Sequence, residues 1–229
     1  MNIAIIPARY GSKRIKFKNI KSFYSNPMIF WTIKQLMKSK IFDLIVVTSD
    51  SEKILTISKR SGANILIKRP KKLSDDKSPT RPVIIHAINY LKKRGIKDLN
   101  SICCVYPCNP FILVNDLKMA FKIFKKDNSK FVFPITEYSH PIQRALRLTS
   151  YLDVKPVFKK NINKRTQDFK KTYYDAGQFY FGSEMLWKSK KTCHEHGRSI
   201  IIPSWRTIDI DNVSDWKRAE LLFKTYKIL

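Results

Sequence analysis

Cationic residues are concentrated in one short loop near the start of the chain. The loop reads PARYGSKRIKFKN over residues 7–19 and directly follows a short apolar run. Gly11 permits a tight turn and a close backbone approach to a ligand, while Arg9, Lys13 and Lys18 supply positive charge. Polyphosphate oxygens accept hydrogen bonds from backbone N–H groups and from such cations. The loop therefore predicts a polyphosphate site, although the spacing alone leaves open a basic loop that is simply exposed to solvent.

The loop differs from the common glycine-rich motifs that bind nucleotides. The sequence contains no GxGxxG, and no Gly-Lys pair is followed by Ser or Thr. Those motifs bind dinucleotides or P-loop nucleotides through defined turns. The sequence therefore disfavours the usual hydride-transfer enzymes and the P-loop NTPases.

Two carboxylates near the other end of the chain share one face of an extended segment. Asp209 and Asp211 alternate with isoleucines in the run TIDID, and alternate residues of extended backbone point the same way. Two such carboxylates repel unless a cation lies between them, and Mg²⁺ accepts carboxylate and phosphate oxygens. A Mg²⁺ site facing the cationic loop would form a nucleotidyl-transfer centre. The alternative is that the acids cap a helix that begins near Ser214.

The four cysteines are expected to be reduced thiols. Cys103, Cys104 and Cys108 lie in or just after one apolar run, and adjacent strand residues point to opposite faces of a sheet. A second group is the run Cys-His-Glu-His at residues 193–196. It has no matching second pair of metal ligands elsewhere in the sequence, so we expect a loop there without a metal.

Short apolar runs alternate with amphipathic stretches of helical length along most of the chain. Strands are expected at 2–6, 44–48, 63–67, 102–106, 131–134, 177–181 and 200–203, and helices at 27–37, 51–61, 82–93, 113–126 and 214–226. This alternation predicts an α/β fold, with a mostly parallel sheet flanked by helices. Ligands of such sheets bind at the carboxyl ends of the strands. Residues 135–175 break the pattern and are interpreted as an inserted arm.

The composition indicates one globular domain with a strongly basic surface. The chain has 229 residues, 43% of them hydrophobic, and a formal net charge of +27. The basic residues are scattered along the chain, which favours a solvated surface over a dedicated nucleic-acid surface. No apolar run has the length of a membrane span, and the N-terminus does not resemble a signal peptide. We therefore expect a cytoplasmic protein that binds neither nucleic acid nor membrane.

Several of these segments together resemble one enzyme family. PARYGSKRIKFKNI is similar to the first motif of the sugar-acid cytidylyltransferases, which include the CMP-N-acylneuraminate and CMP-KDO synthetases. The similarity continues through VVTSD and IDIDNVSDWKRAE. Within the family, the branch that uses pseudaminic acid is most similar, through CCVYPCNPF, TEYSHPIQRALRL, YYDAGQFYFG and PSWRTIDIDNVSDW.

The resemblance implies a Rossmann-like fold of the nucleotide-diphospho-sugar transferase type, paired through the arm as a homodimer. It also implies the reaction of CTP with a nine-carbon sugar acid to give a CMP-sugar and pyrophosphate, with Mg²⁺ as the cofactor. Sialic and legionaminic acid are alternative substrates. A non-catalytic nucleic-acid-binding protein, suggested by charge alone, is the alternative from a different class.

The resemblance also assigns residues to roles. The catalytic cations are Arg9, Lys13 and Lys18. The nucleotide-binding positions are Ala8, Gly11, Ser12, Asn19, Arg69 and Thr80, with Asp50 near the base and metal. The sugar-binding positions are Tyr106, Gln143, Arg144, Arg165, Gln167, Asp175 and Gln178, of which Arg144 or Arg165 would meet the sugar carboxylate across the dimer. The metal carboxylates are Asp209 and Asp211.

The first motif departs from the family pattern in two places. Tyr10 stands where a second glycine is common, and Lys16-Phe17 replaces a common Pro-Arg pair. These changes alter the shape of the loop without removing a charge that the chemistry needs.

Overall fold

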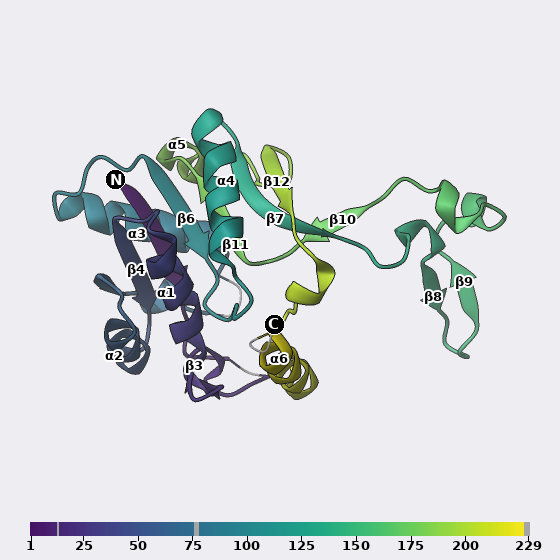
Figure 1. Cartoon of the computed structure of the whole chain (residues 1–229), viewed down its shortest axis with the longest axis horizontal. Helices are drawn as coiled ribbons and strands as arrows, with labels where there is room; N and C mark the ends of the chain where they lie inside the picture. Colours follow the sequence, from purple (N-terminus) through teal and green to yellow (C-terminus); the bar gives the residue numbers. More distant parts are fainter. Residues whose placement is uncertain (13, 76–77, 227–229) are drawn as a thin grey trace.

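A mixed sheet of eight strands forms the centre of the molecule. The computed structural model describes residues 1–12, 14–75 and 78–226. The strand order is β10-β7-β11-β6-β1-β4-β5, and β12 also pairs with β7 (Figure 1). The sheet strands are β1 (Asn2–Pro7), β4 (Leu44–Ser49), β5 (Ile65–Lys68), β6 (Ser101–Val105), β7 (Phe131–Glu137), β10 (Tyr173–Asp175), β11 (Phe179–Gly182) and β12 (Gly197–Ile201).

Most of this sheet is parallel, as the alternation of elements predicts, and β12 also runs parallel to β7. Strands β6, β1, β4 and β5 run parallel to one another, so their carboxyl ends lie at one edge. Strand β11 is antiparallel to both β6 and β7, and therefore begins at that same edge. The loops that follow β1 and β6 and the loop that precedes β11 are thus brought together.

Helices cover both faces of the sheet because its strands are apolar on both sides. The helices are α1 (Met28–Ser39), α2 (Glu52–Arg60), α3 (Thr80–Lys93), α4 (Val114–Lys126), α5 (Glu184–Lys188) and α6 (Val213–Tyr226). Buried residues of α1, α2 and α4 share one core cluster, and those of α3 and α5 share another. Cys103 lies in the first cluster and Cys104 in the second, which confirms that the two thiols point to opposite faces.

The sequence located these elements with small errors at their ends. Ser51 caps α2 by accepting a hydrogen bond from the backbone N–H of Ile54. Helix α3 begins at Thr80 rather than Pro82. Strand β12 begins at Gly197, earlier than expected, because its register is set by pairing with β7 and not by its own apolar residues. Two further thiols, Cys108 and Cys193, are only partly buried.

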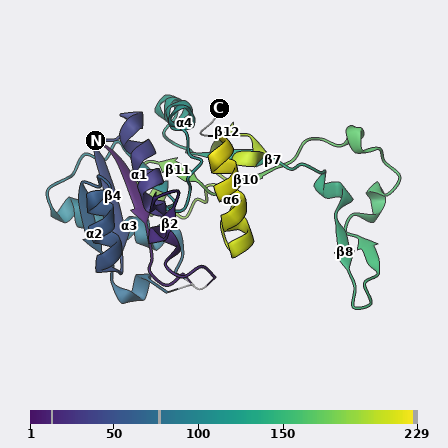
Figure 2. The same cartoon turned by 60° about the horizontal axis from the view of Figure 1, so that its bottom comes forward.

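Residues 138–172 form an arm that extends away from the sheet. The arm leaves after β7 and returns in β10, and both Figures 1 and 2 show it projecting from the body. It contains a hairpin of β8 (Leu146–Leu148) and β9 (Val154–Pro156), with short 3₁₀ turns at Ile142–Arg144, Lys159–Asn161 and Thr166–Asp168. The body strands are longer than predicted, so the arm is shorter than the expected range 135–175.

A third core cluster holds the two ends of the chain together. Phe23 lies in a small hairpin of β2 (Ser22–Phe23) and β3 (Asn26–Pro27) and contacts Trp216 of α6 edge to face, with ring centroids 5.4 Å apart. Ile208 and Ile210 are buried in the same cluster. The cationic loop and the TIDID segment therefore belong to one packed unit.

Three further 3₁₀ turns lie at Lys18–Ile20, Lys71–Leu73 and Ser204–Arg206.

A buried ion pair fixes the approach to the TIDID segment. Asp116 in the first turn of α4 accepts two hydrogen bonds from the Arg206 guanidinium, and both side chains are 7% exposed. The backbone oxygen of Arg206 also accepts a hydrogen bond from Nε2 of the buried Gln178, at 2.9 Å. Removing one partner of such a pair leaves an uncompensated buried charge.

We therefore expect Asp116→Ala to lower the free energy of unfolding by about 3–5 kcal/mol. Asp168→Ala is the matched control, because it breaks an exposed pair with Arg165 and should change stability by less than about 1 kcal/mol. Urea unfolding of both variants measures the difference. Equal losses in the two variants would contradict the role of the Asp116–Arg206 pair.

Candidate active site

A cleft of about 750 Å³ opens where the carboxyl ends of β1 and β6 meet the start of β11. This is the edge at which parallel α/β sheets bind ligands. Its lining is rich in charged and polar side chains from four separate segments of the chain. The charged and polar lining residues are Arg9, Ser12, Arg14, Lys18, Asn19, Tyr106, Cys108, Asn109, Tyr174, Asp175, Thr207, Asp209 and Asp211.

The first wall of the cleft is the cationic loop, whose backbone is held by the neighbouring strands. The backbone N–H of Tyr10 donates to Oδ1 of Asp50 at 3.0 Å. Nδ2 of Asn19 donates to the carbonyl of Arg9 at 2.9 Å, and the buried Arg69 donates to the carbonyl of Ala8 at 3.4 Å. Asn19, Arg69 and Asp50 therefore hold the backbone of the cationic loop in place.

The two departures from the family motif contact each other. The rings of Tyr10 and Phe17 pack with centroids 4.6 Å apart. Phe17 has a φ of 58°, a backbone conformation that few residues with bulky side chains adopt. The aromatic contact between Tyr10 and Phe17 closes the loop on itself.

The second wall is the TIDID segment, which is tied to the loop by charge. Nζ of Lys18 donates to the carbonyl of Ile210 at 2.7 Å and lies 3.4 Å from Oδ1 of Asp211. Nη2 of Arg14 lies 2.8 Å from Oδ2 of the same carboxylate. Residues almost 200 positions apart in the sequence are thereby joined across the cleft.

The surroundings of Asp209 disfavour the negative charge of its carboxylate. Partial burial, followed by the negative charge of Asp211, raises the pKa of Asp209 above its ordinary value. Both side chains alternate with the buried Ile208 and Ile210, which confirms that they share one face. The pair supplies hard oxygen donors whose repulsion a divalent cation would relieve, so these residues fit a Mg²⁺ ion.

The alternative role of these acids as helix caps is not supported. The caps of α6 are Asn212 and Asp215, which exchange side-chain hydrogen bonds with each other's backbone N–H at 2.9 and 3.0 Å. The same Asp215 carboxylate also accepts from the backbone N–H of Asp211. The side chains of Asp209 and Asp211 remain directed to the cleft.

The third wall is formed by hydroxyl groups and one carboxylate. Oγ1 of Thr80 lies 3.0 Å from the hydroxyl of Tyr106, and burial raises the pKa of that phenol to about 12. The Asp175 carboxylate accepts from the hydroxyl of Tyr180 at 2.9 Å and lies 2.8 Å from Nε2 of His194. Tyr106 and Tyr180 therefore stay protonated at neutral pH and can donate hydrogen bonds.

The structure brings together most of the predicted site residues, but not all of them. Those that line the cleft are Arg9, Ser12, Lys18, Asn19, Tyr106, Asp175, Asp209 and Asp211. Ala8, Arg69 and Gln178 are buried behind the cleft wall, and Gly11 is exposed on the loop. Lys13 lies outside the described residues.

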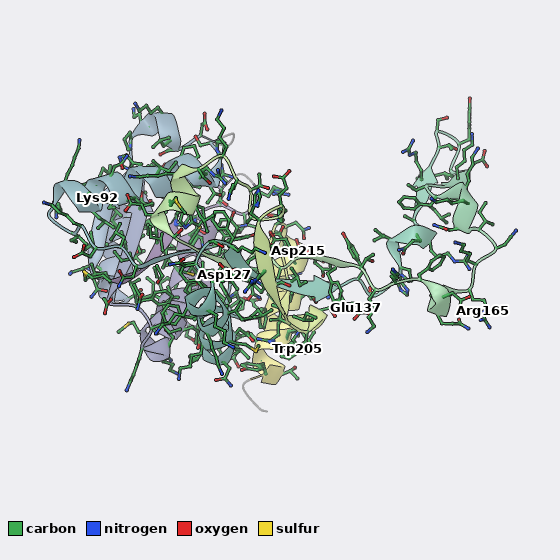
Figure 3. All side chains as sticks on the ribbon, turned by 90° about the horizontal axis from the view of Figure 1, so that it is seen from above. Lys92, Asp127, Glu137, Arg165, Trp205 and Asp215 are labelled. Atoms are coloured by element: carbon green, nitrogen blue, oxygen red, sulfur yellow. The ribbon has the colours of Figure 1, made fainter. Side chains whose placement is uncertain are left out.

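Four predicted sugar-binding residues lie on the arm and not in the cleft of the same chain. They are Gln143, Arg144, Arg165 and Gln167. Figure 3 shows Arg165 on the distant arm, well away from Asp215 at the start of α6. Arg144 donates to the carbonyl of Ile162 at 2.8 Å, and Arg165 pairs with Asp168. Within one chain, these four side chains contribute to the arm alone.

Sequence reasoning missed five of the charged and polar residues that line the cleft, namely Arg14, Cys108, Asn109, Tyr174 and Thr207. Arg14 and Asn109 each follow the end of a parallel strand within a few residues, and the carboxyl-end rule could have found them. Asn109 donates to the carbonyl of Gly177 at 3.2 Å, which joins the β6 and β11 loops. Tyr174 contacts Thr207 through their hydroxyls at 3.1 Å, a pairing across the fold that no local pattern indicates.

The fold and the cleft together define a nucleotidyltransferase of the α/β class. The family model for cytidylyltransferases matches residues 3–210. The pseudaminic acid cytidylyltransferase of Campylobacter jejuni is 37% identical over 224 residues, which are 97% of this chain and 96% of that protein. The chain therefore belongs to the cytidylyltransferase family.

Two more distant proteins place the chain within this family and fold. An N-acylneuraminate cytidylyltransferase of Escherichia coli is 28% identical over 95% of this chain and 51% of that protein. A structure of CMP:2-keto-3-deoxy-manno-octonic acid synthetase complexed with CTP superposes with a TM-score of 0.72 and 12% identity, over 98% and 99% of the two chains. At that identity, the superposition supports the fold alone.

Asp209 provides a test of the strained carboxylate pair. A carboxyl group with a raised pKa binds protons more tightly in the native than in the unfolded state. Stability therefore falls as the pH rises from the ordinary carboxyl pKa of 3.8 through the raised native value. Without divalent cations at neutral pH, we expect Asp209→Asn to raise the melting temperature. The gain should shrink as the pH falls through this window.

Thermal melts of the wild type, Asp209→Asn and Asp153→Asn across this pH range measure the effect. Asp153 is exposed on the arm, so its variant controls for the loss of one negative charge from a basic protein. A lower melting temperature of Asp209→Asn at neutral pH would contradict the repulsion between the two carboxylates.

Proposed function

We propose that this chain transfers CMP from CTP to the anomeric hydroxyl of pseudaminic acid, releasing pyrophosphate. The observation that carries the proposal is the 37% identity to a pseudaminic acid cytidylyltransferase across nearly all of both chains. The cleft supports it independently, since a cationic loop faces two hard carboxylates at the ligand-binding edge of the sheet. The product would serve surface-glycan or flagellin glycosylation.

The cationic loop would bind the triphosphate. Arg9, Lys13 and Lys18 are the cations of this loop assigned to the triphosphate, and Arg9 and Lys18 line the cleft. Fixed donors aimed at charge that develops on the leaving pyrophosphate contribute roughly 3–4 kcal/mol each in other enzymes. Because Asn19 and Asp50 hold the loop backbone, these donors need little rearrangement when the nucleotide binds.

Asp209 and Asp211 would hold the Mg²⁺ ion of this reaction. When bound, Mg²⁺ would neutralise charge on the phosphate oxygens around the reacting α-phosphorus. Arg14 and Lys18 keep Asp211 in place from the other side of the cleft. The cation would stabilise the negative charge of Asp209, which burial and the neighbouring Asp211 disfavour.

The sugar acid would bind at the Tyr106 and Asp175 side of the cleft. Its anomeric oxygen would attack the α-phosphorus in line, so that one P–O bond forms as the bond to the β-phosphate breaks. Positioning supplies much of the rate in such a displacement. No covalent enzyme intermediate is required, and burial raises the pKa of the Cys108 thiol at the cleft to about 12, so this thiol stays neutral.

Two alternatives give different outcomes. A sialic or legionaminic acid substrate would keep the same reaction and change only the sugar pocket. A basic nucleic-acid-binding protein would bind by bulk charge, with an affinity that falls steeply with salt and survives loss of Asp209.

Among the described residues, no helix has the length and apolar character needed to cross a bilayer. A cytoplasmic location is part of the proposal.

Pyrophosphate release from CTP and Mg²⁺ in the presence of pseudaminic, legionaminic, sialic or KDO acid tests the function. We expect release with pseudaminic acid. Lys18→Met should lower kcat/KM by about 10²–10³-fold through loss of one electrostatic donor, and Asp211→Ala should abolish activity. Lys16→Met is the control, since Lys16 is an exposed cation of the same loop outside the cleft lining.

Pyrophosphate release with only one of the other acids would change the proposed sugar substrate and leave the proposed CMP transfer intact. An active Asp211→Ala enzyme would contradict the metal assignment. If a folded protein released no pyrophosphate with any of the four acids, the proposed reaction itself would be contradicted.

We further propose that residues 1–229 act as a single catalytic domain whose arm pairs two chains in a homodimer. The arm exposes Leu146, Leu148, Tyr151, Leu152 and Val154 by 59–87%. A group of apolar side chains this exposed is typical of an interaction surface. A second copy that covers the arm would also explain why Arg144 and Arg165 lie far from the cleft of their own chain.

Mixing two inactive variants tests whether the arm completes the partner's cleft. Asp211→Ala has an intact arm, and Arg165→Ala has an intact cleft. If the two chains share sites, the mixture should regain about a quarter of the wild-type activity per site, because half of the dimers are mixed and each holds one complete site. No regain after subunit exchange would contradict a shared site.

The interface itself is tested separately by light scattering. Leu148→Glu places a charge in the exposed apolar arm and should convert the dimer to a monomer. Leu221→Glu is the matched control, because Leu221 is 70% exposed on α6.

A further inference from the structure

The Cys-His pair between α5 and β12 gains a third metal-binding donor from the fold. Cys193 and His194 follow α5, and Asp175 is the last residue of β10, 18 positions earlier. Their ligand atoms all lie within 4.8 Å of one another. The sequence shows no second ligand pair for this motif, because the third donor comes from β10, which pairs with β7 as β12 does.

The donor carboxylate is already oriented by its neighbours. Oδ1 of Asp175 accepts from the backbone N–H of Gly177 and from the Tyr180 hydroxyl, both at 2.9 Å. Oδ2 faces Nε2 of His194 at 2.8 Å, and the His194 ring packs edge-on against Phe133 with centroids 5.6 Å apart. Supporting hydrogen bonds of this kind orient the ligands of protein metal sites.

The combination of donors selects a class of ion. A thiolate, an imidazole and one carboxylate suit Zn²⁺ and similar transition ions, whereas Mg²⁺ takes oxygen ligands. We propose that Asp175, Cys193 and His194 bind one divalent transition ion of the Zn²⁺ class, with an open fourth position. This site is separate from the Asp209–Asp211 pair and differs from it in chemical hardness.

The Asp175 and His194 donors already lie close to the separation that such an ion requires. Two ligands about 2.1 Å from a tetrahedral metal lie about 3.4 Å apart, so Oδ2 of Asp175 and Nε2 of His194 would separate by a fraction of an ångström. Binding would release the proton of the Cys193 thiol. Burial, followed by the negative charge of Asp175, raises the pKa of this thiol, and the positive charge of Arg81 opposes that shift. The Arg81 guanidinium donates to the carbonyls of Ser189 and Lys191 in the same segment.

Occupation of this site would affect the cleft, because Asp175 belongs to both. Asp175 lines the cleft through its position beside Tyr174 and Gly177. An ion that engages its carboxylate withdraws a hydrogen-bond acceptor from the bound sugar acid. We therefore expect Zn²⁺ to raise the KM for the sugar acid and to leave the KM for CTP unchanged; this coupling rests on the proposed function.

Titration of the full-length protein with Co²⁺ tests the binding site without any activity assay. A thiolate ligand gives Co²⁺ a charge-transfer band in the near ultraviolet, and tetrahedral Co²⁺ absorbs strongly in the visible. We expect both signals at one equivalent, their displacement by Zn²⁺ and no displacement by excess Mg²⁺. Cys193→Ser should abolish the charge-transfer band, and His194→Ala should weaken Co²⁺ binding by about 10-fold or more.

Cys108→Ser is the matched control, because Cys108 is the other partly buried thiol and lies at the cleft. Loss of the band in Cys108→Ser, or its survival in Cys193→Ser, would overturn the site. Absence of the band in the folded wild type would overturn it as well. If the band appears and Zn²⁺ leaves the KM of the sugar acid unchanged, the coupling to the cleft is overturned and the metal site stands.

Discussion

Opposite charges from the two ends of the chain meet in one cleft, and the arrangement of the site depends on that meeting. Lys18 and Arg14 reach Asp211 across the cleft, while Ile208 and Ile210 anchor the acidic segment in the same core as Phe23. The chain carries 45 basic and only 18 acidic residues. The pairing of Asp209 and Asp211 is therefore a local feature of this cleft. Nearby cations offset the repulsion between the two carboxylates, and the buried isoleucines hold the segment from its other side.

Burial and charge divide the cleft into regions with different chemistry. The cationic loop offers donors to an anion, and the Asp209–Asp211 face offers hard oxygens. The Tyr106–Tyr180 side keeps neutral hydroxyls, because desolvation raises the pKa of both phenols. Asp175 lies where this last region meets the Cys193–His194 segment. The proposed transfer would use the first three regions together, and a soft metal ion would act on the fourth.

The arm exposes apolar side chains that the body of the same chain does not cover. Its residues 138–172 leave the sheet at β7 and return at β10, next to the cleft. Its apolar side chains have no core of their own to enter, and a small hairpin is not stable by itself in water. Covering by a second copy would stabilise the arm, and under the proposed pairing it would bring Arg144 and Arg165 to the cleft of the partner.

The sequence alone determined the alternation of strands and helices, the cationic loop and the shared face of Asp209 and Asp211, because each follows from local periodicity and residue type. The tertiary structure decided which distant residues meet. Asp116 with Arg206, Lys18 with Asp211, Tyr174 with Thr207 and Asp175 with His194 are contacts across the fold that leave no local signature. The order and direction of the strands set these contacts, since a sheet brings together loops by strand position and not by distance along the chain.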